Sequence, residues 1–453
     1  MPGSPRILAH GLALLWLLSG LPACSSSRPA ARNGKPVPEM TRPAAAAVAP
    51  APAVAPYPVM LGIDVLEAEG FAAVKGKRIG LLTHPAGVNR RGVSTIEVLR
   101  HAPGVKLVAL YAVEHGLYND QTAETPVASS VDPRTGLKVI SLYSGKILKP
   151  TPAQLKDIDA LVIDLQDIGT RSYTFSGGMK TAMEACFQNG KEVIVLDRPN
   201  PLGGLKVDGP PLDADLMSDV GRFRVPYVHG LTMGELARMA LDTKPPGGLN
   251  LSDAARARAR LTVIPMRGWS RAMTWPETGL KWVATSTMIR DFEAAEGYPM
   301  VGLGCILGGF SHGIGRQYPF RGLSHPGVGR DVLERDLRAL NLPGLGFRLV
   351  SAIDAKGKPT TGIYIDITDY RAWEPTELNF YLMKLACVLD AKNPFANVTA
   401  VERRTFEVHV GSAAFFNDLA AKGKNVDIAA WLIRWREQAA IYQRESQKYW
   451  LYR

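Results

Sequence analysis

Cysteine is scarce in this chain of 453 residues: there are four, and their spacing matches neither a metal site nor a disulfide framework. Long apolar runs are scarce too, because the one such run lies at the N-terminus, which excludes a polytopic membrane protein. No G-x-G-x-x-G follows the first predicted strand and no G-x-x-x-x-G-K-[ST] occurs, so nucleotide cofactors lack their usual phosphate cradle. Neither a G-x-S-x-G elbow nor an H-E-x-x-H zinc signature is present, and we expect no cofactor and no metal.

Acidic residues are outnumbered by basic ones, 42 against 53, which gives a net charge of +11. The excess is spread without a basic block or a zinc-finger spacing, so nucleic acid is not expected as a partner. A diffuse positive surface suits an anionic polymer such as bacterial cell wall, or a membrane face. The 46% of hydrophobic residues are typical of a globular protein, and the length predicts two domains.

The N-terminus is predicted to be a targeting segment and not part of the folded domains. Residues 1–23 have the pattern of an export signal, with Arg6 before an apolar stretch, and the Ala-Cys pair that ends at Cys24 resembles a bacterial lipobox. We expect cleavage before Cys24 and lipidation of its thiol; the alternative is an ordinary secretory peptide with an incidental cysteine. Residues 24–57 are rich in proline, alanine and serine and predict an extended tether. The protein would then lie in the cell envelope, facing the periplasm and attached to a membrane by the lipid alone.

Residues 58–265 alternate short apolar runs with amphipathic segments. Four runs are nearly continuous in apolar residues, as strands buried on both faces are: 78–83, 107–113, 161–164 and 192–197. Helices are predicted at 94–101, 151–157, 176–189 and from Thr232, the second and last with capping boxes. This alternation predicts an α/β fold with a doubly wound parallel sheet.

Residues 266–453 predict a smaller α+β domain packed on the first. Loops rich in glycine, tryptophan and proline are expected up to about residue 328. Strands are then predicted at 347–353 and 362–368, and helices at 376–389 and 427–444. Cys186, Cys305 and Cys387 lie singly in apolar segments and are expected to be small buried hydrophobes.

Each predicted strand of the first domain ends in a polar cluster. These clusters begin at His84, Glu114, Asp164 and Asp197. In an open parallel sheet the carboxyl ends of the strands form the crevice where ligands bind, so the four clusters should meet at one rim. For any single cluster a strand-ending turn is an equal alternative, but four together indicate a site.

The chemistry that this rim suggests is acid–base work on a polar substrate. Glu114 leaves an apolar strand, and desolvation there favours the protonated form that a general acid needs. Arg171 is expected to keep a neighbouring aspartate, Asp164 or Asp167, ionised. A protonated and an ionised carboxyl group together are what cleavage of a glycosidic bond uses. Tyr173 and Phe175 supply aromatic faces on which sugar rings pack.

The motifs that contain these residues resemble those of a known family. From Gly62 onward the chain resembles the NamZ-type exo-β-N-acetylmuramidases, a bacterial glycoside hydrolase family long known as a domain of unknown function. The resemblance is carried by Glu114-His-Gly, by the segment from Asp164 to Phe175, by Asp197-Arg-Pro-Asn-Pro-Leu-Gly-Gly204 and by the segment from His229 to Ala237. Thr278-Gly-Leu-Lys-Trp282 and the terminal Tyr449-Trp-Leu-Tyr452 also fit.

The resemblance implies a Rossmann-like first domain, a smaller C-terminal domain and a catalytic cleft between them. It implies removal of N-acetylmuramic acid from the non-reducing end of peptidoglycan fragments without a nucleotide or metal, with Glu114 at the position of the proposed catalytic glutamate. The predicted catalytic residues are Glu114, Asp164 and Asp167. The residues predicted to bind substrate are His84, His115, Gln166, Arg171, Tyr173, Asp197, Arg198, Asn200, His229, Ser311 and Arg316.

One segment departs from the family. The family carries E-G-T-N-x-S-x-G-R-G-T, where this chain reads Ile306-Leu-Gly-Gly-Phe-Ser-His-Gly-Ile-Gly-Arg316. The family's arginine becomes Ile314, and loss of that cation would weaken the grip on a lactyl carboxylate, unless Arg316 or Arg321 replaces it. We therefore keep two hypotheses: a lipid-anchored glycosidase, and a tethered peptidoglycan-binding protein of the same fold with little or no activity. Retention or inversion, and a substrate acetamido group acting as nucleophile, stay open, as does the oligomeric state.

Overall fold

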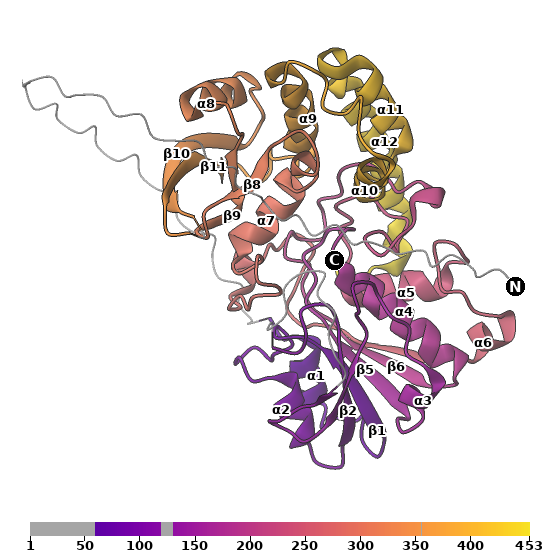
Figure 1. Ribbon diagram of the computed structural model, residues 1–453. Coiled ribbons are helices and arrows are strands. Elements are labelled where there is room, and N and C mark those ends of the chain that lie inside the picture. The colour runs from indigo at the N-terminus through magenta and orange to yellow at the C-terminus, as the bar shows by residue number, and fades with distance from the viewer. Residues whose placement is uncertain (1–58, 119–129, 355) are drawn as a thin grey trace, which may run out of the picture. The chain divides into compact units, whose positions relative to one another are not determined.

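The computed structural model of the protein describes residues 59–118, 130–354 and 356–453 (Figure 1). The predicted signal segment 1–23, the lipidation site Cys24 and the tether 24–57 lie outside these residues. No helix in the described ranges has both the length and the apolar character needed to cross a bilayer.

The first sheet has seven strands in the order β3-β4-β2-β1-β5-β6-β7. All neighbours run parallel except β3 and β4, which are antiparallel. The strands are β1 (Arg78–Thr83), β2 (Lys106–Ala112), β3 (Ser130–Val131), β4 (Lys138–Ser141), β5 (Ala160–Asp164), β6 (Glu192–Leu196) and β7 (Leu261–Ile264). The parallel strands therefore have the strand order of a Rossmann-like sheet, and the predicted α/β fold is confirmed.

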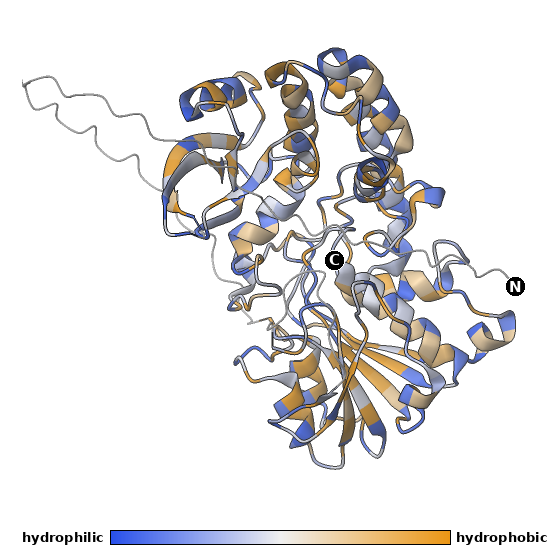
Figure 2. Ribbon diagram, in the orientation of Figure 1, coloured by the Kyte–Doolittle hydropathy of each residue, from blue (hydrophilic) through white to orange (hydrophobic). Residues whose placement is uncertain are grey.

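Both faces of this sheet are covered, which is why its strands are apolar almost throughout. Along β5, Leu161 and Ile163 enter one core while Ala160 and Val162 enter the other. Helices α1 (Gly62–Ala68) and α2 (Thr95–Arg100) pack on one face; α3 (Pro152–Leu155), α4 (Thr174–Gln188) and α5 (Met233–Asp242) pack on the other, with α6 (Asp253–Arg258) beside α4 (Figure 1). Figure 2 shows the strands as a hydrophobic layer between helices whose outer faces are hydrophilic.

The second half of the chain contains a four-stranded antiparallel sheet in the order β10-β11-β9-β8. Its strands are β8 (Ser311–Ile314), β9 (Tyr318–Ser324), β10 (Leu345–Ile353) and β11 (Pro359–Ile367). The helices are α7 (Phe292–Val301), α8 (Arg330–Ala339), α9 (Glu377–Leu389), α10 (Ala400–Val410), α11 (Ala413–Lys422) and α12 (Ile428–Ser446). The smaller α+β part is thus confirmed, although α7, β8 and β9 lie where loops were predicted.

Short 3₁₀ turns complete the chain: η1 (Ala214–Leu216), η2 (Pro276–Thr278), η3 (Leu303–Cys305), η4 (Gly423–Asn425) and η5 (Gln447–Tyr449). Both sheets contribute to one hydrophobic core, which holds Ile163 of β5 together with Ile363 of β11 and Phe380 of α9. Cys186 and Cys387 are buried and Cys305 is half-buried; all three are free thiols.

The order of the strands determines where a ligand site forms. The chain connects outward from β1 to β2 on one side and begins its second half at β5 on the other, so β1 and β5 flank the point where the connections reverse. Thr83 and Asp164, the last residues of these two strands, are register partners. Ligands bind outside the carboxyl ends of the strands at such a point.

Candidate active site

Glu114 stands in a tight turn that follows β2. The next residue, His115, has φ of +72° and Gly116 has φ of +78°, so both adopt the left-handed conformation. That conformation costs a residue with a side chain roughly 1–2 kcal/mol, and such strain is commonly kept at functional sites. The Glu114 side chain is buried, and its Oε2 accepts a hydrogen bond of 2.7 Å from Oγ1 of Thr174, the first residue of α4. The start of α4 therefore holds the carboxyl group in place.

Asp167 lies in the loop after β5 and keeps an oxygen available. Its Oδ2 accepts the Gly169 amide at 2.9 Å and lies 3.5 Å from Nε2 of His229. The Leu231 amide donates to Nδ1 of His229, so the ring proton sits on Nε2 and faces Asp167. Oδ1 of Asp167 is buried and has no hydrogen-bond partner among the described residues. A buried carboxylate oxygen left open in this way is ready to accept a proton or a hydrogen bond from a ligand.

Tyr298 of α7 links the two carboxyl groups. Burial raises the pKa of the Tyr298 hydroxyl, and the charges of Glu114 and Asp167 raise that pKa further. Ser172, which bonds Tyr298, and Thr174, which bonds Glu114, are separated by one residue, so one segment holds the phenol and this carboxyl group. Ser172 donates to the Tyr298 oxygen at 3.3 Å and is itself 2.7 Å from the Tyr227 hydroxyl. Tyr298 thus keeps its own proton for a neighbouring carboxylate or a ligand.

A row of aromatic rings runs through this cluster. His84, after β1, meets Phe175 edge to face at 4.7 Å, and Phe175 meets Tyr173 at 4.7 Å. Tyr173 lies 6.0 Å from Tyr298, which lies 5.0 Å from Phe320 of β9; His312 of β8 stacks on Phe320 at 4.7 Å. Phe320 has φ of +56°, a second strained residue beside the site. The row joins the strand ends of the first sheet to the β8–β9 hairpin.

Three predicted substrate residues surround the carboxyl groups. His84 accepts the Gln166 amide at Nε2, and burial lowers its pKa well below the usual value, as do the charges of Arg198 and His115. His84 is therefore a neutral ring at ordinary pH. The Gln166 carboxamide donates to the carbonyls of Asp167 and Pro199. Tyr173 donates to Oγ1 of Thr285 at 2.7 Å, and burial raises the pKa of its hydroxyl.

Asp164 differs from its predicted role as a catalytic carboxylate. Its side chain is 0% exposed, and its oxygens accept from Arg198 at 2.5 and 2.9 Å and from Thr95 Oγ1 at 2.5 Å. Arg198 also donates to the Val88 carbonyl at 2.6 Å. Because its side chain is fully buried and accepts three hydrogen bonds, Asp164 orients Arg198 and is closed to a substrate. This corrects the prediction.

Arg171 is a second correction. It was expected to hold an aspartate ionised and to bind substrate, but its guanidinium donates to four backbone carbonyls, those of Pro210, Val225, His409 and Val410. Burial lowers its pKa to about 10. Arg198, and not Arg171, is the partner of the aspartate, because β5 and β6 are neighbours in the sheet.

Asp197 and Asn200 also have structural partners instead of an open face. Asp197 accepts from the amides of Arg198 and Gly234 and from the hydroxyls of Thr232 and Tyr452. Asn200 donates to the Leu231 carbonyl and accepts the Leu202 amide. Each therefore fastens loops around the site, which corrects the prediction that they bind substrate directly.

Ser311 and Arg316 are on the β8–β9 hairpin. Ser311 is half-buried and is the register partner of Ser324, while Arg316 is exposed and its carbonyl accepts from Arg290. Arg321 is occupied by Glu296 at 2.8 Å and by the Ile365 carbonyl. Ile314, at the family's arginine position, is buried with Val350 and Ala352. The hairpin reaches the cluster through the aromatic row, in which Phe320 contacts Tyr298 and His312 stacks on Phe320.

Sequence reasoning missed several residues of this cluster. Thr174, which holds Glu114, lies in the motif from Asp164 to Phe175, two residues before the helix predicted at 176–189, and this position was the available signal. Tyr298 and Thr285 lie in a region predicted as loops, and no spacing marks them. Among the described residues, no group of three potential metal ligands comes together.

Comparison with known proteins identifies relatives of the whole folded part. Residues 79–293 match the family described as exo-beta-N-acetylmuramidase NamZ, N-terminal, and residues 297–452 match the corresponding C-terminal family. The peptidoglycan beta-N-acetylmuramidase NamZ of Bacillus subtilis (strain 168) is 39% identical over 331 residues, which are 72% of this chain and 77% of that protein.

Two solved structures from Bacteroides fragilis NCTC 9343, both of DUF1343 family proteins, share the fold. One is 36% identical with a TM-score of 0.77 and covers 89% of this chain and 100% of its own. The other is 23% identical with a TM-score of 0.65, covers 87% and 99%, and shows the fold alone. Since the two family matches together span most of the chain and the relative is a glycosidase by name, the resemblance read from the motifs is confirmed. The chain belongs to the NamZ family of exo-β-N-acetylmuramidases.

Proposed function

We propose that the protein hydrolyses the glycosidic bond of N-acetylmuramic acid at the non-reducing end of peptidoglycan fragments. The observation that carries this proposal is the cluster at the strand ends, in which Thr174 holds Glu114, Ser172 bonds Tyr298, and Asp167 keeps one buried oxygen open. The name of the Bacillus subtilis relative supports the choice of sugar and polymer. A buried, fixed carboxyl group and a second carboxylate with an open oxygen are the two groups that glycoside hydrolysis needs.

The proposed roles follow from what each group can donate or accept. Glu114 protonates the glycosidic oxygen as the bond to the anomeric carbon breaks, and the fragment leaves as an alcohol. Asp167, held by the Gly169 amide, accepts a hydrogen bond from the second reactant through its open Oδ1. That reactant is water or the acetamido group of the sugar itself; in either case water supplies the new hydroxyl. The aromatic row offers ring faces for the sugar.

The position at which the family has an arginine carries no cation in this chain. The family's arginine is replaced by Ile314, whose side chain is buried away from solvent, and Arg321 is already paired with Glu296. This observation favours the second candidate, a protein that binds peptidoglycan fragments and turns them over slowly or not at all.

The proposed location is the cell envelope, with the folded part tethered by residues 24–57 to a lipid on Cys24. Its support is the N-terminal sequence: a basic residue, a short apolar stretch and a small residue before a cysteine. Globomycin-sensitive processing, or labelling of the full chain with a radioactive fatty acid that Cys24→Ser abolishes, would test the anchor.

The decisive test of the activity is Glu114→Gln, which keeps the shape and the Thr174 contact but removes the proton. We expect kcat on a chromogenic N-acetylmuramic acid glycoside to fall by about 10²–10⁴-fold, the range that general acid catalysis contributes. Glu437→Gln, an exposed glutamate on α12, is the matched control and should leave kcat unchanged.

The same assay separates the two candidate functions. The wild-type protein should release free sugar from a disaccharide that ends in N-acetylmuramic acid and not from one that ends in N-acetylglucosamine. Binding of both fragments without release of sugar at high protein concentration would favour the binding protein. Unchanged turnover in Glu114→Gln would remove Glu114 from the mechanism.

A further inference from the structure

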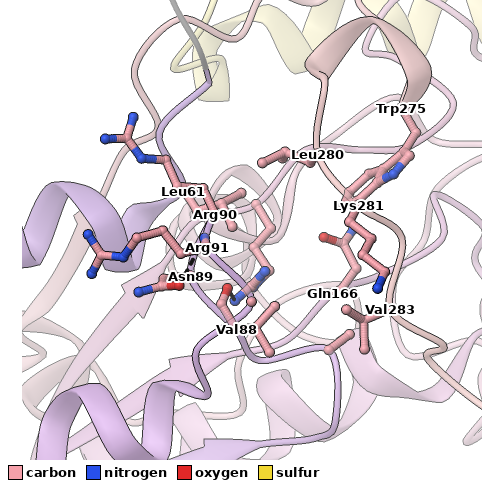
Figure 3. A pocket seen from close by; sticks show the side chains of 13 residues that line it. Leu61, Val88, Asn89, Arg90, Arg91, Gln166, Trp275, Leu280, Lys281 and Val283 are labelled. Carbon is pink, nitrogen blue, oxygen red and sulfur yellow. Dashed lines mark hydrogen bonds between the residues drawn. The ribbon is translucent and has the colours of Figure 1, made fainter.

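A cavity lies at the same edge of the first sheet, outside the cluster around Glu114. It has a volume of about 250 Å³. The loop from Val88 to Arg91 forms one side, and the segment from Trp275 to Val283 faces it (Figure 3). The side chain of Gln166 reaches it from the loop after β5. None of the predicted catalytic carboxylates lines it.

The cavity and Glu114 are on opposite sides of the strand ends. Leu61, which lines the cavity, is the residue before α1, and the lining loop leads into α2; both helices cover one face of the sheet. Glu114 instead contacts the start of α4, on the other face. Gln166 lies between the two, with its side chain in the cavity wall and its backbone amide bonded to His84. The cavity therefore borders the cluster around Glu114, and its lining includes none of that cluster's carboxyl groups.

The charges around the cavity have one sign. Four basic residues line it and no acidic residue does; the four are Arg90, Arg91, Arg198 and Lys281. Arg91 is paired with Glu67 and Arg198 with Asp164, whereas Lys281 is exposed and makes no ion pair within the described residues. An anionic group at the mouth would meet the unpaired ammonium of Lys281 and the guanidinium of Arg90, whose Nε lies 4.0 Å from Oδ1 of Asp64.

Besides Nδ2 of Asn89, the wall holds two buried polar atoms that lack partners in the described part of the chain. They are Oε1 of Gln166, in a side chain 2% exposed, and the indole N–H of Trp275, in a side chain 6% exposed. Because both hydrogens of the Gln166 amide are used on carbonyls, its oxygen is left facing the space that the side chain lines. A buried polar group without a partner is costly, so an acceptor and a donor left open beside a cavity point to a ligand. An amide, which donates and accepts, satisfies both.

We propose that this cavity binds an acylamino carboxylate, with the amide between Gln166 and Trp275, the apolar part against Val88, Leu280 and Val283, and the carboxylate beside Lys281 and Arg90. This chemistry occurs in peptidoglycan in two places, the N-acetylated muramic acid and the stem peptide. Assignment to a wall fragment rests on the proposed function, but binding as such does not.

The test is calorimetric titration of the full chain with two probes, N-acetyl-L-alanine for the peptide source and N-acetylmuramic acid for the sugar source. Lys281→Glu should weaken binding of the probe about tenfold or more, since a charge-assisted contact becomes a repulsion. Trp275→Phe keeps an aromatic ring, although a smaller one, and breaks no side-chain hydrogen bond among the described residues. It should still weaken binding of the same probe about fivefold by removing the donor. Lys392→Glu, an exposed lysine of the C-terminal half, is the control and should bind like wild type.

Each outcome has a definite meaning. Weaker binding of N-acetyl-L-alanine by both variants supports a peptide ligand. Weaker binding of N-acetylmuramic acid alone supports the sugar. The proposal is overturned if wild type and both variants bind each of the two probes equally, or if the uncharged N-acetyl-L-alanine methylamide binds as tightly as N-acetyl-L-alanine. No turnover is measured, so the result is independent of Glu114; Glu114→Gln should titrate N-acetyl-L-alanine like wild type.

Discussion

At the scale of residues, two aspartates that stand three positions apart have opposite surroundings. Asp164 ends β5 and is closed in by Arg198 and Thr95, while Asp167 faces His229 and keeps one oxygen open. A buried ion pair of the first kind stabilises only as a pair, because either charge left alone in the interior is very unfavourable. The first aspartate therefore orients an arginine, and the second is free to act on a ligand.

We expect Asp164→Asn to lower the free energy of unfolding by about 3–5 kcal/mol, since Arg198 would stay buried without a countercharge. The control is Asp366→Asn, which breaks the exposed ion pair with Arg348 and should cost no more than about 1 kcal/mol. Urea unfolding followed by circular dichroism measures both. Equal small losses in the two variants would show that the buried pair has no special weight.

At the scale of elements, the sequence pattern was sufficient to predict helix caps and strands, which depend on residues close together in the chain. The Thr151 capping box forms as predicted, with the Gln154 side chain returning to the Thr151 amide. The four predicted strands are present because runs buried on both faces must be apolar. Strands β4 and β7 have four residues each, and so short a run of apolar residues was not enough to predict them.

Contacts between distant segments could not be predicted in this way. Proximity in sequence favoured Arg171 as the partner of the aspartates, but the order of the sheet brings Arg198 to Asp164 across 34 positions. Tyr298 reaches the site because α7 packs on β9 and β9 belongs to the second sheet. Only the tertiary arrangement determines such pairs, so the rim was predictable while the partners within it were not.

Helix α4 carries a pH-dependent element of stability. Burial lowers the pKa of Lys180 from 10.5 to about 8, and the charge of Arg222 acts in the same direction. Between these two values the unfolded chain binds more protons than the folded one, so stability rises as the pH rises from about 8 to 10.5. The whole effect is at most about 3 kcal/mol.

Comparison of wild type with Lys180→Met isolates this contribution. The difference in unfolding free energy, wild type minus variant, should increase between pH 8 and pH 10 in urea titrations. Lys392→Met, an exposed lysine without an ion pair in the described residues, should give a difference that does not change with pH. A constant difference for Lys180→Met as well would mean that the buried ammonium is as well solvated as an exposed one.

At the scale of the whole molecule, the last residues of the chain return to the first sheet. The Tyr452 hydroxyl donates to Asp197 at 2.5 Å and accepts the Met266 amide at 3.0 Å. The Leu451 amide donates to Glu235 of α5, and Trp450 lies over the guanidinium of Arg271. Together with the core shared by both sheets, these contacts make the polar loops around the site depend on the C-terminus.

Tyr452→Phe tests this dependence with a change of one oxygen. The Met266 amide would be left buried without an acceptor and Asp197 would lose a donor, so the free energy of unfolding should fall by about 2–3 kcal/mol. Because the core is continuous, far-ultraviolet and near-ultraviolet circular dichroism should report one common transition at a lower urea concentration. Tyr381→Phe, whose hydroxyl makes no hydrogen bond within the described residues, should leave the midpoint unchanged. Two separated transitions in Tyr452→Phe would instead show that the halves of the chain unfold independently once the C-terminal contact is weakened.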